Sequence, residues 1–233
     1  MASVDVVIPI FNEAAMLGEL HTRLRRACPT AKIIFVDNGS TDGTPEALER
    51  LSDVKLVRHT QNLGYGRSLR DGIAAGNGEL IVMIDADLEY FPEDIPLLAD
   101  ALEEAPAVYG SRFLAETAPR MAPTRRFGNA LVSAVFSTLF HQRLTDLYTG
   151  LRAVRRNALP ESALHAEGFE FVLELAARLA ENGAQIAEVP VQYRERTQGT
   201  SKMRHIPEFL RFVRRLVLLK LAGTSRSRPP PLL

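Results

Sequence analysis

The chain lacks an excess of charge of either sign, because its 233 residues include 28 lysines and arginines and 28 aspartates and glutamates. This balance gives no indication of nucleic-acid binding. A single cysteine, Cys28, excludes an internal disulfide framework and favours a reducing compartment. No uninterrupted apolar run approaches the ~20 residues of a membrane-spanning helix. The N-terminus shows no basic segment or cleavage-type site, so we expect no signal peptide. The five histidines have no regular spacing, which argues against zinc.

The neutral total conceals a cationic C-terminal segment. Anionic lipid attracts basic residues near its surface by roughly 1 kcal/mol each, so this segment predicts weak, salt-sensitive membrane contact. A helix that packs its apolar face on the domain and leaves its basic face in solvent is the alternative. We expect a single folded domain over residues 1–204, an amphipathic basic helix over 205–224 and a disordered tail over 225–233. From residue 202 onward the chain has one acid, Glu208, and these basic residues: Lys202, Arg204, Arg211, Arg214, Arg215, Lys220, Arg226 and Arg228.

Short apolar strands alternate with helical segments through the first half of the chain. This pattern predicts an α/β fold with a mostly parallel sheet and helices on both faces. Pro190 places the last strand, over residues 186–193, at an edge. The other expected strands cover residues 4–10, 33–36, 54–57, 79–84 and 107–109. We expect one helix from the loop at residues 11–13 to about residue 28, one that Thr44 and Pro45 cap and open, and one from the loop at residues 62–66 to about residue 75. Further helices are expected over residues 92–103, 127–140, 169–180 and 206–222.

Polar residues follow the strands where they end, and ligands of parallel α/β sheets bind at that edge. Residues 81–84 are apolar, and Asp85 and Asp87 follow them at a spacing of two. In an extended segment both carboxylates would point the same way. Hard cations such as Mg²⁺ or Mn²⁺ take carboxylates together with substrate phosphates. The pattern therefore predicts a metal-dependent site for a phosphate-containing donor, with the remaining strand-end groups around it: Asn12, Glu13, Asp37, Asn38 and Arg112.

The segment over residues 127–140 is apolar at helical spacing and follows three arginines, Arg120, Arg125 and Arg126. A core helix explains the apolar spacing. An amphipathic helix fronted by arginines also suits a membrane surface, and the sequence leaves both open.

These stretches together resemble family 2 glycosyltransferases with the GT-A fold, in particular the dolichyl- or polyprenyl-phosphate mannose synthases. The resemblance covers residue 4 to about residue 202. It implies a Rossmann-like GT-A domain that acts on a nucleotide-diphosphate sugar. The stretches that carry it are VIPIFNE (7–13), VDNGSTDGT (36–44), NLG (62–64), DADL (85–88), GSR (110–112), DLYTG (146–150), EVPV (188–191) and RTQGTSK (196–202).

The resemblance implies a role for each matching position. Pro9, Phe11, Glu13, Val36 and Asp37 would hold the nucleobase and ribose. The metal, Mg²⁺ or Mn²⁺, and the diphosphate would lie at Asp85, Ala86 and Asp87. Further phosphate contacts would come from Arg112, Arg196 and Lys202.

Three features depart from the resemblance. Lipid-linked members often have a second acid where this chain has Asn38. They often have Gln where this chain has Glu89, which is a third oxygen ligand or a bystander. Many carry spanning helices at the C-terminus, whereas the sequence here shows none. We therefore expect peripheral membrane attachment at most. We therefore expect a cytoplasmic protein, or one held on the cytoplasmic face of the membrane.

The acceptor decides which residues are catalytic. A lipid phosphate is already ionised and needs cations to place it, for which Arg112, Arg125 and Arg126 are candidates, beside Asp87 at the metal. A hydroxyl of a soluble glycan or natural product needs a base, for which Asp146 is the candidate, although a turn role explains it equally. We favour inverting transfer of a mannose- or glucose-type sugar to polyprenyl phosphate.

Two other functions make different demands on the sequence. A nucleotide-sugar-binding protein without turnover has no use for the full set of charged site residues. A sugar nucleotidyltransferase needs a glycine-rich basic loop after the first strand, and residues 9–13 contain neither Gly nor Lys. Tyr65 and Tyr148 line a sugar pocket or serve only in packing.

Overall fold

The computed structural model describes residues 2–115, 121, 123–160, 163–194 and 216–220. Within them one seven-stranded sheet has the strand order β3-β2-β1-β4-β6-β5-β7. All pairs are parallel except those of β6, which runs antiparallel to both neighbours, β4 and β5. The strands are β1 (Val4–Ile10), β2 (Lys32–Asp37), β3 (Lys55–Arg58), β4 (Leu80–Met83), β5 (Ala107–Ser111), β6 (Arg152–Arg155) and β7 (Ile186–Pro190).

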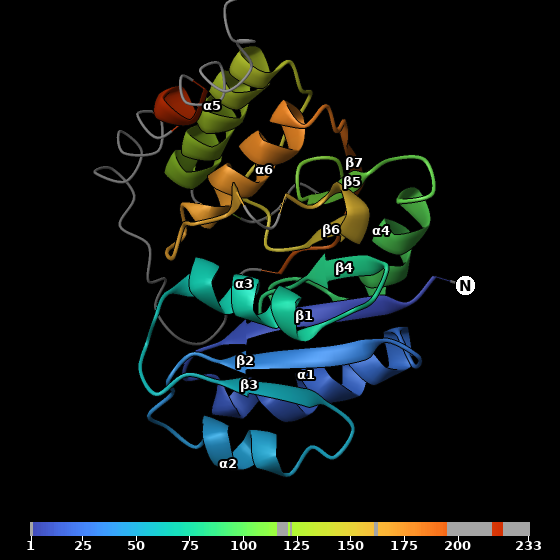
Figure 1. Cartoon of the computed structure of the whole chain (residues 1–233), viewed down its shortest axis with the longest axis vertical. Helices are drawn as coiled ribbons and strands as arrows, with labels where there is room; N and C mark the ends of the chain where they lie inside the picture. The colour runs from blue at the N-terminus through green and yellow to red at the C-terminus, as the bar shows by residue number, and fades with distance from the viewer. Residues whose placement is uncertain (1, 116–120, 122, 161–162, 195–215, 221–233) are drawn as a thin grey trace, which may run out of the picture.

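Helices cover both faces of the sheet, with α3 in front of it and α1 behind it in the view of Figure 1. The apolar run of β1 supplies both layers because alternate residues point to opposite faces. Val7 joins the core under α3, α5 and α6, and Val6 and Ile8 join the core under α1 and α4. The helices are α1 (Ala14–Ala27), α2 (Thr44–Glu49), α3 (Tyr65–Ala75), η1 (Pro92–Asp94), α4 (Ile95–Ala101), α5 (Pro123–Phe140), η2 (Arg156–Ala158) and α6 (Phe171–Glu181).

The α/β architecture and the edge position of β7 are confirmed. The strand β6 is missing from the sequence expectation, which had no element between residues 151 and 154. The helix expected over 92–103 divides into η1 and α4. Thr44 lies inside α2 rather than capping it, and its hydroxyl accepts a 3.0 Å bond from the Glu13 amide.

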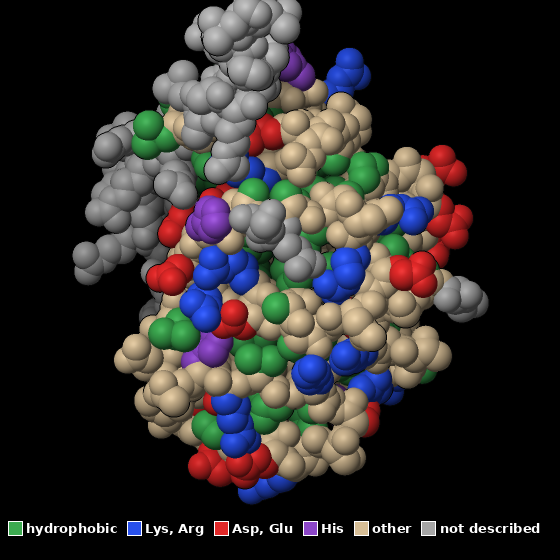
Figure 2. All heavy atoms as spheres, in the orientation of Figure 1, with side chains coloured by type: hydrophobic (Ala, Val, Ile, Leu, Met, Phe, Trp, Pro, Cys, Tyr) green, Lys and Arg blue, Asp and Glu red, His purple; other side chains and the backbone are tan. Residues whose placement is uncertain are grey.

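The C-terminal predictions fall mostly outside the described residues. Residues 216–220 are helical, and Leu216 and Leu219 are buried in the core beside Phe136 and Phe140. The rest of the predicted basic helix and the tail over 225–233 are not described. In the described part of the chain no helix is both long and apolar enough to cross a membrane. Basic and acidic side chains are interspersed over the face shown in Figure 2, as the balanced charge implies.

Candidate active site

The loops after β1 and β2 lie together at the carboxyl edge of the sheet. The backbone amide of Asn38 donates to the backbone carbonyl of Ile10, at 2.8 Å. Asn12 lies between the two loops: its amide donates to the Ser40 hydroxyl at 3.0 Å, and its side-chain oxygen accepts from the Thr41 amide at 2.8 Å. Asn12 has φ +58°, a conformation that Asn tolerates better than most residues. The predicted nucleotide residues of both loops are therefore brought together.

Within this pair of loops the predicted residues differ in access. Pro9 pairs with Val36, and Ile10 with Asp37, across β1 and β2. Val36 is fully buried in the core, so its side chain is not open to a nucleotide. Asp37 is 4% exposed, and one of its oxygens accepts a 3.0 Å bond from the Ser40 amide. Phe11 and Glu13, at the β1 end, are partly buried.

Asn38, where the resemblance leads us to expect an acid, connects the end of β2 to the loop before α3. Its amide nitrogen donates to Asn62 Oδ1 at 2.9 Å. Its oxygen accepts from the Leu63 amide at 2.9 Å and lies 2.9 Å from His59 Nδ1. The side-chain amide of Asn38 therefore both donates and accepts hydrogen bonds within the protein.

Asp85 and Asp87 follow β4, but not in an extended segment. β4 ends at Met83, the chain turns at residues 86 and 87, and Leu88 has φ +57°. Asp85 Oδ1 accepts a 2.8 Å bond from the Tyr65 hydroxyl, and Asp87 Oδ1 accepts a 3.1 Å bond from the Glu89 amide. The predicted position of the two acids is correct, and the predicted geometry is wrong because a turn, not a strand, presents them.

Glu89 does not join the two aspartates in a three-carboxylate site. Its carboxylate accepts a 2.9 Å bond from the Tyr193 hydroxyl. Among the described residues no three His, Cys, Asp or Glu side chains come together around one point. The set of Asp85, Asp87 and Glu89 is therefore not assembled here. Asp85 and Asp87 still fit a hard divalent cation whose other ligands are diphosphate oxygens and water.

Gly150, in a stretch that carried the resemblance, and Arg152, which no motif indicated, both lie beside Asp85. A Cβ on Gly150 would collide with the Asp85 carboxylate, so glycine is needed for this close approach. Arg152, in the centre of the sheet, is 1% exposed, and its Nε and Nη1 have no hydrogen-bond partner. Burial raises the pKa of Asp85, and the charge of Arg152 opposes part of that rise. Arg152 thus provides a buried positive charge behind the predicted metal ligand.

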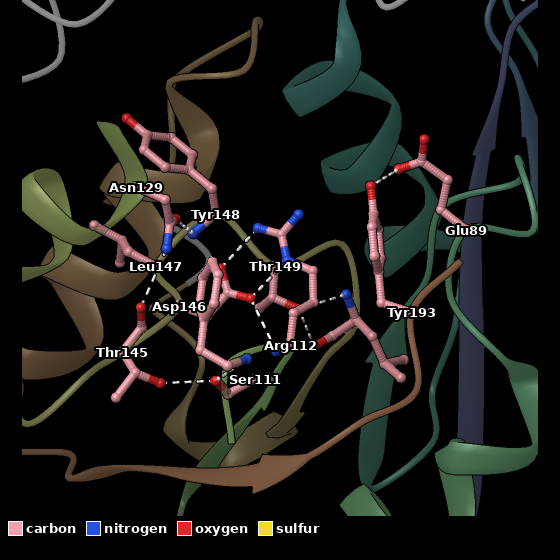
Figure 3. A network of polar contacts seen from close by, with 12 residues as sticks. Glu89, Ser111, Arg112, Asn129, Thr145, Asp146, Leu147, Tyr148, Thr149 and Tyr193 are labelled. Atoms are coloured by element: carbon pink, nitrogen blue, oxygen red, sulfur yellow. Dashed lines mark hydrogen bonds and ion pairs between the residues drawn. The ribbon is translucent and has the colours of Figure 1, made fainter. Parts of the chain in front are cut away.

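Arg112 and Asp146 form a buried, two-pronged ion pair (Figure 3). Arg112 Nε donates to Asp146 Oδ2 at 2.7 Å, and Nη2 donates to Oδ1 at 2.8 Å. The Arg112 amide adds a third bond to Oδ2, at 3.1 Å. Asp146 is fully buried and Arg112 is 8% exposed. Both carboxylate oxygens are engaged, so in this arrangement Asp146 orients a cation and is not exposed as a base.

Aromatic rings surround the same guanidinium. Its central carbon lies 5.2 Å from the Tyr193 ring centre, 5.7 Å from that of Phe113 and 5.8 Å from that of Tyr90. These are distances at which a ring face attracts a cation. Arg126, at the start of α5, lies 5.9 Å from the Phe113 ring. Phe113 therefore has a contact to each of two predicted phosphate-binding arginines.

Glu188, on β7, holds the turn that carries Asp146. It accepts bonds from the amide and hydroxyl of Thr145, at 2.8 and 2.9 Å, and from the amide of Asp146 at 2.8 Å. Asn129 of α5 donates to the Thr145 carbonyl at 3.1 Å. Burial raises the pKa of Glu188, and these bonds oppose the rise. Glu188 lies in a stretch that carried the resemblance, whereas nothing in the sequence indicated Asn129.

The remaining predicted cations cannot be placed. Arg120, Arg196 and Lys202, and the side chain of Arg125, lie outside the described part of the structure. Their roles stay predictions.

Comparison with known proteins gives the family. The profile described as Glycosyl transferase family 2 matches residues 5–161. Polyprenol monophosphomannose synthase of Mycolicibacterium smegmatis is 32% identical over 211 residues, which are 85% of this chain and 80% of that protein. Undecaprenyl-phosphate mannosyltransferase of Micrococcus luteus is 30% identical over 208 residues, 84% of this chain and 86% of that protein.

A solved structure shows the same fold. Glucosyl-3-phosphoglycerate synthase from Mycobacterium tuberculosis, in complex with uridine-diphosphate, superposes with a TM-score of 0.69 at 22% identity, over 99% of this chain and 82% of that one. The same protein has also been solved with Mn²⁺ and uridine-diphosphate-glucose. Sheet order, site and sequence profile therefore agree that the chain belongs to glycosyl transferase family 2.

Proposed function

We propose that this glycosyltransferase moves a mannose- or glucose-type sugar, with inversion, from a nucleotide-diphosphate sugar to a polyprenyl phosphate. The observation that carries the proposal is the pairing of Arg112 with Asp146. It fixes one edge of a guanidinium in a site where Arg112 and Arg126 lie 5.7 and 5.9 Å from the centre of the Phe113 ring. Two cations suit a phosphate acceptor. The two relatives named above act, by their names, in lipid-linked mannose transfer.

In this proposal each part of the site has one task. Asp37, with the backbone of the β1 and β2 loops, holds the nucleoside. Asp85 and Asp87 hold a divalent cation, which would neutralise the diphosphate leaving group as the glycosidic bond breaks. Arg112 and Arg126 orient the acceptor phosphate, whose oxygen attacks the anomeric carbon from the face opposite the diphosphate. The new bond is a sugar phosphodiester and the nucleoside diphosphate leaves, so no general base is needed.

The outer face of α5 supports contact with a membrane surface. Phe127 is 70% exposed and Leu131 38% exposed, next to the exposed Arg126. The opposite face, with Val132 and Phe136, is buried in the core. One face of α5 therefore packs in the core, and the other is exposed and available to a membrane surface. We expect sedimentation with anionic liposomes at low salt that is lost at high salt, because exposed charges are screened. Absence of sedimentation at low salt would contradict this part of the proposal.

The test of function is transfer from a panel of labelled nucleotide sugars, with Mn²⁺, to a short polyprenyl phosphate, followed by organic extraction. We expect label in the organic phase with the wild type and with Asp100→Ala, an exposed acid on α4. Asp87→Ala should give none. Label that appears only in an aqueous glycan would refute the lipid-phosphate acceptor. It would also return Asp146 to the position of a candidate base.

A further inference from the structure

The ring of Phe169 is exposed beside the predicted diphosphate site. Phe169 is 44% exposed and precedes α6. Its inner face stacks on Tyr65, with ring centres 4.9 Å apart and planes 17° apart. The hydroxyl of Tyr65 donates to Asp85 Oδ1 at 2.8 Å. A chain of two contacts thus connects an exposed aromatic ring to a predicted metal ligand.

From this geometry we propose that the outer face of Phe169 supports the sugar ring of the donor. The inference rests on the proposed function, because it assumes a nucleotide-diphosphate sugar whose diphosphate lies at Asp85 and Asp87. It adds a residue that contacts the sugar alone.

The backbone around Phe169 is held in place, so the ring is a fixed surface. The Glu174 carboxylate accepts bonds from the amides of His165 and Ala166, at 2.8 and 2.7 Å. The Arg67 amide donates to the carbonyl of Glu167 at 3.0 Å. These bonds tie the segment before Phe169 to both α6 and α3.

Two glycines allow this segment to approach α3. Gly64 has φ +101°, and a Cβ there would collide with the backbone carbonyl of Glu167. A Cβ on Gly66 would lie 2.6 Å from the carbonyl oxygen of Ala166. The glycines that precede Tyr65 and follow it therefore serve the stack, since they permit Phe169 to reach the Tyr65 ring.

The distance fits a sugar. The hydrogen bond, the length of the tyrosine side chain and the stack together place the Phe169 ring centre within about 11 Å of the Asp85 carboxylate. The diphosphate of the donor is bonded to the ribose on one side and to the sugar on the other. Because the proposed function places the nucleoside at the β1 and β2 loops, the sugar is the group left to reach a ring at this range. One face of a pyranose presents C–H groups, and these match the negative face of an aromatic ring. Ligand sites commonly use such an aromatic wall beside a few polar groups.

The experiment compares binding of a sugar nucleotide with binding of the same nucleotide without sugar. GDP-mannose against GDP, and UDP-glucose against UDP, are titrated into the full chain with Mn²⁺. Phe169→Leu should weaken binding of the sugar nucleotide about tenfold and leave the nucleoside diphosphate within about twofold. Phe169→Trp should retain binding, because it keeps an aromatic face. Leu97→Ala, at an exposed leucine on α4, is the control and should change neither.

Each result decides one question. Equal weakening of both ligands by Phe169→Leu, or weakening of neither, overturns the inference and leaves the proposed function standing. A raised KM for polyprenyl phosphate with unchanged donor binding also overturns it, because the ring would then contact the lipid. If the wild type binds no sugar nucleotide at all, the proposed function itself fails. Tyr65→Phe keeps the stack and removes the bond to Asp85, so it should preserve the sugar-dependent difference.

Discussion

The pair of Arg112 and Asp146 is the strongest test of how the site is built. Removing one partner of a buried ion pair leaves the other charged and unpaired, at a cost of about 3–5 kcal/mol. Asp146 is fully buried and Arg112 nearly so, hence solvent cannot replace the lost partner. We therefore expect Asp146→Ala to lower the free energy of unfolding by about 3–5 kcal/mol. Asp146→Asn should cost less, because its oxygen still accepts one bond.

Urea unfolding followed by circular dichroism measures this cost. With a slope of about 3 kcal/mol per molar urea, the midpoint should fall by about 1–1.7 M for Asp146→Ala. Glu49→Gln is the control, because Glu49 pairs with Arg58 at 2.8 Å but both side chains are largely exposed. Such pairs contribute about 0–1 kcal/mol, so the control midpoint should hardly move.

Kinetics separates the orienting role from the base role. If Asp146 orients Arg112, Asp146→Asn should raise the KM for the phosphate acceptor and leave the KM for the donor unchanged. If Asp146 is a base, the variant should lose kcat with a hydroxyl acceptor and keep its stability. A variant with wild-type midpoint and wild-type acceptor KM would refute the orienting argument. The double variant Arg112→Met/Asp146→Leu should regain stability, because no unpaired charge is left buried. It should not regain activity, because the Arg112 charge that places the acceptor phosphate is gone.

Two smaller predictions follow from single contacts. Gly64→Ala forces a Cβ into a positive φ and against Glu167, so we expect a loss of about 2 kcal/mol, seen as a melting temperature lower by about 4–8 °C; an unchanged value would contradict the packing. Burial raises the pKa of Cys28 to about 11 from a model-compound value of 9.0, so the folded thiol should react slowly with iodoacetamide at pH 8 and faster in urea. Because the folded pKa is the higher one, the stabilisation from the neutral thiol is complete below pH 9 and is lost as the pH rises through 11. Equal alkylation rates in buffer and in urea at pH 8 would contradict this.

The sequence predicts those parts of the fold whose signals are local. An apolar run bounded by turn-forming residues defines β1 and β2, and the acids after β4 stand at the edge where parallel sheets bind ligands. The strand β6 could not be found in this way. It has only four residues, one of them the buried Arg152, and its antiparallel pairing with β4 and β5 depends on chain segments far away in sequence.

Side-chain contacts between residues far apart in the chain could not be predicted from the sequence either. Arg112 and Asp146 are 34 residues apart, and their sequence contexts indicated a separate role for each, phosphate binding for Arg112 and base catalysis for Asp146. Because the two are in contact, Asp146 holds the Arg112 guanidinium in position, and only Arg112 remains a candidate to contact a phosphate. Glu89 and Tyr193 are 104 residues apart, and their bond gives Glu89 a partner that the sequence did not indicate. In both cases the residue type was informative, and the partner decided what the residue can do.

Asn38 shows the same dependence in the opposite direction. As a sequence feature it departs from the acid expected in lipid-linked relatives. In the structure it is 5% exposed, donates to Asn62 and accepts from Leu63. A carboxylate at this position could not donate to the Asn62 oxygen, so the amide is needed to join the end of β2 to the loop before α3. The departure is therefore explained by packing between two loops, and Asp37 remains the proposed side-chain contact to the base.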